Sequence, residues 1–153
     1  MLAQADVPAT KTILVEGREF TVRDLIESEK ASCQQNTELT FKLIGLSHYL
    51  SDDEIWHNAE GQPWNIERLI HEELKQPING AACGGLHRLM GLSRAVSDRD
   101  ESQLPINGEW ARAQRYISEY QNFAANFQNP DGSFSTNWFV TLESDIDLSL
   151  IHI

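Results

Sequence analysis

The sequence predicts an all-α protein made of stacked antiparallel helical hairpins, with a short β-hairpin at its N-terminal end. Apolar residues recur at steps of three and four in the stretches that follow residue 21. The alternation of apolar and polar residues that is typical of strands is confined to residues 12–22. Connections of roughly four to fifteen residues join the helical stretches, which is typical of antiparallel helical neighbours.

The first two elements follow from turn and capping residues. Residues 12–22 place β-branched and apolar residues on both sides of Gly17, which predicts a short hairpin. The apolar spacing then becomes helical, and Thr21 is the expected N-cap of a first helix that runs to about Ser32. Asp24 lies in the first turn of that helix, where a negative charge is favourable.

The second helix is predicted to start from a cap at Asn36 or Thr37. Its main apolar residues fall at i, i+4, i+7 and i+11: Leu39, Leu43, Leu46 and Leu50. A third helix begins after Asn65, its expected cap, and ends before Pro77 and Gly80.

The fourth helix is expected from about Ala81 to Val96, with a loop over residues 98–108 behind it. The fifth helix is the longest and ends at the Asn-Pro-Asp-Gly turn of residues 129–132. Its apolar stripe is the clearest in the chain: Trp110, Ala113, Ile117, Tyr120, Ala124 and Phe127. We expect the second, fourth and fifth helices to be the most buried.

The composition bounds the class of protein. Of the 153 residues, 41% are hydrophobic and 23% are charged, as is ordinary for a folded globular protein. Twenty-three acidic and twelve basic residues give a formal net charge of −11, which repels polyphosphates and anionic lipids. We therefore expect no nucleic-acid partner. No apolar run approaches the ~20 residues of a transmembrane helix, so we expect no membrane-spanning segment.

The cellular compartment stays open. Cys33 and Cys83 are the only cysteines, which excludes a disulfide-dense secreted scaffold but not a single bridge. Residues 3–5, Ala-Gln-Ala, have the form of a signal-peptidase site whose apolar region would lie upstream of Met1. We expect export to the periplasm if such a signal precedes the chain, and a cytoplasmic protein otherwise. Residues 1–11 are predicted to form a flexible N-terminal segment.

The last residues, 148–153, read Leu-Ser-Leu-Ile-His-Ile. The transposase-adapter sequence CTGTCTCTTATACACATCT encodes the same residues when it is read in frame. A natural apolar tail that closes a hydrophobic groove is the alternative. We expect residues 148–153 to be a sequencing-adapter artefact, so that the helical-hairpin domain covers residues 12–147 and the gene continues beyond Asp147.

The end of the fifth helix carries the most specific motif. Four residues form an aromatic, Gln, Gly-x-aromatic pattern: Phe123, Gln128, Gly132 and Phe134. The pattern resembles the repeat of squalene-hopene cyclases and related prenyltransferase-like α/α toroids, and the resemblance covers about residues 108–139. Leu is usual where this chain has Ala124, and Trp is usual at the final aromatic. The resemblance implies that the stacked hairpins form a partial α/α toroid.

In those families the Gln side chain bonds the backbone at the start of the next helix, and the final aromatic packs against it. The chemistry of the residues agrees with this role, because Gly132 permits a tight turn and an amide satisfies unpaired groups at helix ends. We interpret these four residues as a structural repeat motif, which implies architecture and not catalysis.

Two further runs, residues 82–92 and 128–139, together carry a second resemblance. These runs read Ala-Cys-Gly-Gly-Leu-His-Arg-Leu-Met-Gly-Leu and Gln-Asn-Pro-Asp-Gly-Ser-Phe-Ser-Thr-Asn-Trp-Phe. They are similar to a set of uncharacterised bacterial proteins of planctomycete type, some of which carry GTPase-activator names. This chain has no zinc-finger set of cysteines and no arginine that the sequence designates as a finger, so it does not support that role.

A candidate ligand-binding cluster comes from the third and fourth helices. Its members are His71, Cys83, His87 and Arg88. Cys83 and His87 share a helical face, and an antiparallel partner helix brings His71 nearly level with Cys83, with His87 about one turn, or ~6 Å, further along. Zinc needs donor atoms only about 3–4 Å apart, whereas a helical Cys is usually a small core residue and a lone His is usually hydrogen-bonded. We predict a ligand-binding corner with no metal and no cofactor.

No catalytic residue is assigned. Residues 98–101, Asp-Arg-Asp-Glu, superficially resemble the Asp-x-Asp-Asp acid motif of squalene-hopene cyclases. They lie in a polar segment, 97–103, that we expect to be solvated, whereas a general acid needs burial and partners to raise its pKa. The four tryptophans could line a cavity, but aromatic residues in a helical core are mostly packing.

These features predict a non-catalytic or uncharacterised ligand-binding fragment of an α/α toroid, with a small molecule or a glycan as its ligand. The alternative is a fragment of an α/α-barrel enzyme, either isoprenoid cyclase-like or glycan-cleaving. A pair of buried acid/base groups facing one cavity separates the two classes. We also expect self-association of the truncated chain through apolar flanks near residues 134–148.

Overall fold

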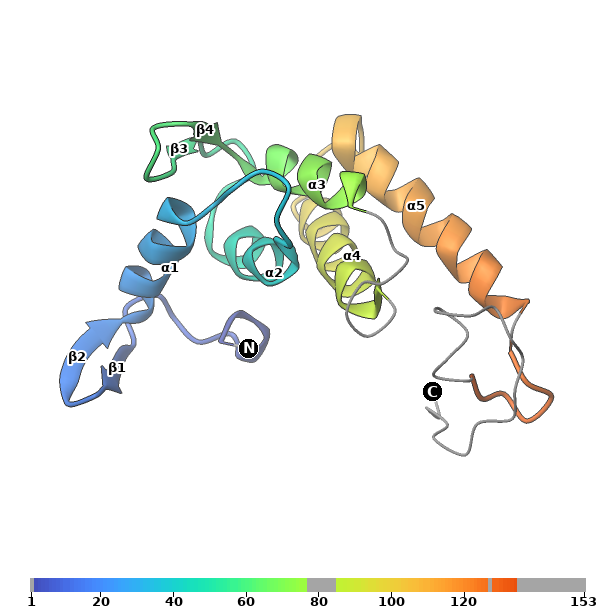
Figure 1. Cartoon of the computed structure of the whole chain (residues 1–153), viewed down its shortest axis with the longest axis horizontal. Coiled ribbons are helices and arrows are strands. Elements are labelled where there is room, and N and C mark those ends of the chain that lie inside the picture. The colour runs from blue at the N-terminus through green and yellow to red at the C-terminus, as the bar shows by residue number, and fades with distance from the viewer. Residues whose placement is uncertain (1, 77–84, 127, 135–153) are drawn as a thin grey trace.

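The computed structural model describes residues 2–76, 85–126 and 128–134 (Figure 1). Helices dominate these ranges: the 3-10 helix η1 (Ala3–Ala5), α1 (Val22–Ala31), α2 (Thr40–Tyr49), α3 (Ile66–Lys75), α4 (Leu86–Glu101) and α5 (Gly108–Ala125). Two small antiparallel strand pairs accompany them: β1 (Thr12–Val15) with β2 (Arg18–Thr21), and β3 (Trp56–His57) with β4 (Pro63–Trp64). The expected helix-dominated fold with an N-terminal β-hairpin is therefore confirmed, while the toroidal stacking stays a prediction.

The helices follow one another along the long axis of the molecule. Figure 1 shows α1, α2, α4 and α5 in that order, with α3 lying over α2 and α4. The β1–β2 hairpin projects from the end at which α1 lies. In the described ranges, no helix is long and apolar enough to cross a membrane.

The first hairpin and the start of α1 match the sequence prediction. Val15 pairs with Arg18, and the two turn residues between them, Glu16 and Gly17, have φ angles of 49° and 78°. Positive φ at both positions is the geometry that a two-residue hairpin needs. At the start of α1, Thr21 and Asp24 exchange hydrogen bonds in a capping box.

The start of α2 differs from the prediction. The helix begins at Thr40, and neither Asn36 nor Thr37 caps it: the Thr37 hydroxyl donates instead to the Gln34 carbonyl at 2.9 Å. The backbone N–H of Leu39 donates to the carboxylate of Glu73, which comes from α3. A residue distant in sequence therefore supplies this cap, and local spacing could not have indicated it.

The start of α3 is capped as expected, because the Asn65 side chain accepts from the backbone N–H of Arg68 at 2.8 Å. The preceding strand pair was not predicted. Asn58 organises its turn by accepting from the backbone of Gln62 at 2.8 Å and donating to the Cys33 carbonyl at 2.8 Å. This second contact ties the turn to the end of α1.

Helix α4 runs five residues beyond the predicted end at Val96, so the expected loop begins only after Glu101. Two side-chain pairs one turn apart support the extra turns: Arg94 with Asp98 at 2.7 Å, and Ser97 with Glu101 at 3.0 Å. The predicted start near Ala81 lies outside the described residues, as do Trp138 and residues 135–153.

The core lies where α2, α3 and α4 meet. Many of the buried apolar side chains come from α2, from the residue before it and from α3: Leu39, Leu43, Ile44, Leu46, Ile66, Leu69 and Ile70. Helix α5 contributes only a few buried residues: Trp110, Ala113 and Tyr120. The expectation that α5 is among the most buried helices is wrong, and α3 takes that place because three neighbours, α2, α4 and α5, pack against it.

Candidate functional site

In the described part of the chain, His71, His87 and Arg88 each contact a different partner. His71 turns toward α5, and its Nδ1 lies 3.2 Å from the Glu109 carboxylate. His87 turns toward α2, where its ring centroid lies 5.2 Å from that of Phe41. Cys83 lies outside the described residues. Among the residues that the structure describes, no group of three His, Cys, Asp or Glu side chains could hold a metal ion.

Arg88, the fourth member, is buried against Glu73. Its Nε lies 3.3 Å from the Glu73 carboxylate, and its Nη1 donates to the Gln76 carbonyl at 3.0 Å. Glu73 is fully buried and also accepts from the Thr40 hydroxyl at 2.8 Å. The guanidinium and the carboxylate neutralise each other inside the protein, so these contacts hold helices together.

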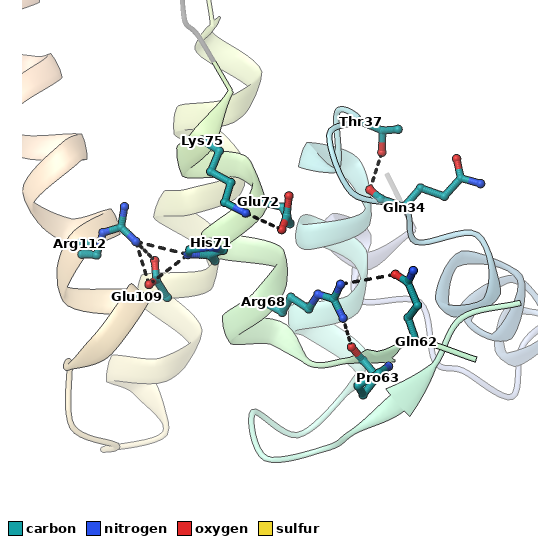
Figure 2. A network of polar contacts seen from close by, with 10 residues as sticks. All are labelled: Gln34, Thr37, Gln62, Pro63, Arg68, His71, Glu72, Lys75, Glu109 and Arg112. Atoms are coloured by element: carbon teal, nitrogen blue, oxygen red, sulfur yellow. Dashed lines mark hydrogen bonds and ion pairs between the residues drawn. The ribbon is translucent and has the colours of Figure 1, made fainter. Parts of the chain in front are cut away.

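His71 belongs to a polar network that joins α3 to α5 (Figure 2). Arg112 donates to both carboxylate oxygens of Glu109, at 2.8 and 2.6 Å, and its Nη1 lies 3.4 Å from Nδ1 of His71. A shallow cavity of about 200 Å³ lies beside it, lined by Leu74, Arg112, Arg115, Tyr116 and Glu119. The His71–Glu109 pair is partly exposed and could orient an imidazole toward a solute.

The structural repeat motif forms a compact turn after α5. The Gln128 amide donates to the Gly132 carbonyl at 2.8 Å, and Gly132 has a φ angle of +87°. Asp131 accepts from the backbone N–H of Ser133 at 3.0 Å and from its hydroxyl at 2.6 Å. Within the described residues, the Gln128 side chain therefore closes its own turn. Phe123 lies at the C-terminal end of α5, and Phe134 follows the turn.

The acidic segment after Val96 is mostly exposed, as expected, but Asp98 and Arg99 are partly buried. Asp98 is half-buried, and desolvation raises its pKa, while the Arg94 guanidinium 2.7 Å away acts in the opposite direction. Arg99 pairs with Asp52 at 3.0 Å and stacks over the Trp110 ring at 3.8 Å. Asp98 therefore pairs within α4, and Arg99 contacts other elements, so both charges have structural partners.

An apolar groove that the sequence did not indicate lies between η1, α1 and α2. Its cavity volume is about 390 Å³, and we name it the α1–α2 groove. Six of its lining residues define it: Leu2, Leu25, Phe41, Ile44, Gly45 and Tyr49. Phe41 is 58% exposed and Leu25 is 40% exposed, although both are large apolar side chains. The groove is therefore open to solvent along its apolar walls.

The shape of the groove has two local causes. Gly45 presents no side chain, and a Cβ at this position would meet nothing within 4 Å. The Tyr49 hydroxyl donates to the Val7 carbonyl at 2.7 Å, which holds the N-terminal residues along one side of α2. Residues 2–11, predicted to be flexible, thus contribute Leu2 and Ala3 to the groove wall.

The apolar surface continues from the groove onto α4. Phe41 contacts His87 through its ring, and the Gln4 amide lies 3.8 Å from the Met90 sulfur. Met90 and its neighbour Leu86 are 43% and 40% exposed. We name the surface formed by Leu25, Phe41, Leu86 and Met90 the apolar strip.

The sequence carried a signal for this surface that we interpreted differently. Phe41 widens the apolar stripe of α2 beyond what its neighbours bury, whereas we expected α2 to be among the most buried helices. We expected the aromatic residues to pack in the core, and Trp56, Trp64 and Trp110 are buried there. Comparison of the chain with protein-family models, with curated proteins and with solved structures gives no match.

Proposed function

We propose that this protein is a non-catalytic ligand-binding domain and that the apolar part of its ligand lies in the α1–α2 groove. The single observation that carries the proposal is the convergence of exposed Leu2, Leu25 and Phe41 on one groove. Contiguous exposed apolar patches with polar rims are typical of binding surfaces. The volume also falls in the usual range for ligand pockets, roughly 300–1,000 Å³.

The wider architecture is part of the same proposal. The Phe123, Gln128, Gly132 and Phe134 motif and the ordered row of helices support stacked hairpins of a partial α/α toroid. The apolar lining favours a ligand with a hydrocarbon or aromatic portion over a glycan. The tryptophans that could have stacked on sugar rings are buried in the described core.

A neutral apolar dye, Nile red, tests the groove directly. The variant Gly45→Phe fills the groove where the structure leaves room for a side chain. We expect this variant to bind the dye at least about tenfold more weakly, because the volume that would receive an apolar ring is occupied. Dye fluorescence titrated against protein measures the affinity, and circular dichroism checks that the variant is folded.

Two leucine variants provide a matched pair. Leu25→Gln changes a groove wall, whereas Leu14→Gln changes a leucine that is 70% exposed on the β1–β2 hairpin. We expect Leu25→Gln to weaken dye binding roughly fivefold, as loss of about 1 kcal/mol of apolar contact implies, with no effect of Leu14→Gln. Equal effects of the two changes would contradict binding in the groove.

The alternative function, an α/α-barrel enzyme, has one favourable observation. The His71 Nδ1 lies 3.2 Å from the Glu109 carboxylate, which leaves the second ring nitrogen in position to exchange a proton with a substrate. Arg112 beside them could bind a negative oxygen. The pair lies at the surface beside a shallow cavity, which is a weaker setting for catalysis than a closed one. A hydrolytic activity that His71→Gln abolishes, with unchanged dye binding, would favour the enzyme.

A further inference from the structure

We propose that the occupant of the α1–α2 groove and the apolar strip is an amphipathic helix of another protein, with a basic polar face. This inference rests on the proposed function and names the partner of the same site. It follows from three properties of the described surface: its extent across three helices, its lack of a strand edge, and the charge around it.

The extent of the surface fits a short helix. Leu25, Phe41 and Met90 come from α1, α2 and α4, which contact one another in series. Packed helices lie 8–10 Å apart, so the strip spans roughly 16–20 Å. A helix of about 12–14 residues covers this length, and its apolar residues at i, i+4, i+7 and i+11 lie on one face. A small molecule that filled the groove would leave Met90 and Leu86 exposed.

The backbone chemistry also favours a helix over an extended peptide. Apart from Leu2, which directly precedes η1, every lining residue of the groove comes from η1, α1 or α2, so no strand edge is available there to pair with a bound strand. An extended peptide would bury unpaired N–H and C=O groups against the apolar walls. A helix satisfies its own backbone hydrogen bonds and presents only side chains to the surface.

The charge distribution selects a basic partner. The chain carries a net charge of −11, and Glu29 lines the groove itself. Glu29 forms an ion pair with the nearby Lys42, which also donates to the Ser32 hydroxyl at 2.8 Å, so these two charges offset each other and leave the net negative charge of the chain unchanged. On the adjacent N-terminal residues, Asp6 is 94% exposed. A basic face is attracted to this rim, whereas a second copy of this chain brings another −11 and is repelled.

The experiment uses the full chain and two labelled synthetic peptides of about 14 residues. Both peptides carry Leu on one helical face, and their polar face is Lys in one peptide and Glu in the other. Fluorescence anisotropy measures binding in about 0.1 M salt. We expect the Lys peptide to bind at least about tenfold more tightly than the Glu peptide, and higher salt to weaken it. We also expect Gly45→Phe to weaken its binding about tenfold and Leu14→Gln to leave it unchanged.

The possible outcomes separate this inference from the proposed function. If both peptides bind equally and Gly45→Phe weakens both, the groove binds helices but the basic partner is overturned. If neither peptide binds while Nile red still depends on Gly45, the helical occupant is overturned and the apolar groove stands. If the Lys peptide binds wild type and Gly45→Phe equally, its binding is nonspecific attraction and the inference fails. A dimer in about 0.1 M salt that Gly45→Phe dissociates identifies a second copy instead and overturns the basic helix.

Discussion

A single carboxylate, that of Glu73, joins three helices in this protein. It accepts from the Leu39 backbone and the Thr40 hydroxyl at the start of α2, and it pairs with Arg88 of α4. Removing one partner of a buried ion pair costs about 3–5 kcal/mol, because the other charge loses that counter-ion. We expect Glu73→Ala to lower the free energy of unfolding by about that amount, measured by urea denaturation.

Two further variants test the cause of that loss. Glu27 also forms an ion pair, with Lys30, but its side chain is 62% exposed, so Glu27→Ala should change stability by less than about 1 kcal/mol. The double change Glu73→Met with Arg88→Met removes both buried charges. It should be less destabilising than Glu73→Ala alone. If the double variant has a lower free energy of unfolding than Glu73→Ala, loss of the counter-ion of Arg88 is not the main cause of the destabilisation.

A second residue-scale prediction concerns Cys33, whose side chain is fully buried beside the end of α1. Desolvation raises the pKa of its thiol above the ordinary value of 9.0, so the protonated form is favoured in the folded state. The stability from this preference is present below about pH 9 and is lost as the pH rises through the folded pKa. In a Cys83→Ser background, we expect maleimide to label Cys33 slowly at about pH 7 and to label it faster across the urea transition. Rapid labelling of the native protein would contradict the burial.

At the scale of the element, two glycines on neighbouring helices should respond oppositely to alanine. A Cβ on Gly45 of α2 meets nothing within 4 Å, so Gly45→Ala should stabilise the protein by about 0.5–1 kcal/mol through helix propensity. A Cβ on Gly91 of α4 would lie 3.2 Å from both the Cγ2 and the backbone oxygen of Thr40. Because that backbone cannot turn away, Gly91→Ala should destabilise by about 1–3 kcal/mol. Thermal denaturation of both variants measures the difference.

The capping box of α1 predicts a pH dependence. Hydrogen bonds from the Thr21 backbone and side chain lower the pKa of Asp24 below its ordinary value of 3.8. A lowered folded pKa contributes stability that is present above pH 3.8 and is lost as the pH falls through the folded pKa. We therefore expect Asp24→Asn to be less stable than wild type near neutral pH, and the gap to narrow in acid. A gap that widens in acid would show that the carboxylate is not stabilised by the cap.

The ends of the helices show which structural features nearby residues can predict. Thr21 and Asn65 were predicted as caps from the residues around them, and both caps are present. The cap of α2 was missed because its oxygen comes from Glu73, more than thirty positions away. The predicted end of α4 lay too early in the chain because the polar residues after Val96 are typical of a loop. In the structure, Arg94 and Asp98 pair along the helix and support its extra turns.

The site depended on tertiary information that spacing alone does not contain. His71 and His87 lie on neighbouring helices as expected, but they contact α5 and α2 respectively, because each helix packs against more than one partner. The groove was not predicted because an apolar stripe does not indicate which of its residues a neighbouring helix will cover. Gly45 opens it, and a glycine within an apolar run carries no distinctive signal in one sequence.

At the scale of the whole molecule, the net charge of −11 and the exposed apolar strip act in opposite directions. In dilute salt, charge repulsion should keep copies of the chain apart, because the screening length is about 30 Å at 0.01 M. In about 1 M salt the screening length falls to ~3 Å, so apolar contact between strips should then produce self-association. Sedimentation velocity at the two salt concentrations measures this change.

The surface responsible can be identified with the same sedimentation experiment. Phe41→Gln removes the most exposed aromatic residue of the strip, so it should reduce association in high salt. Leu14→Gln removes the most exposed large apolar residue of the β1–β2 hairpin and should leave association unchanged. Association that depends on Leu14 and not on Phe41 would place the contact on the hairpin, where a two-stranded ribbon also offers open backbone edges. Association that is strongest in dilute salt would instead mean that opposite charges, and not the apolar strip, bring the copies together.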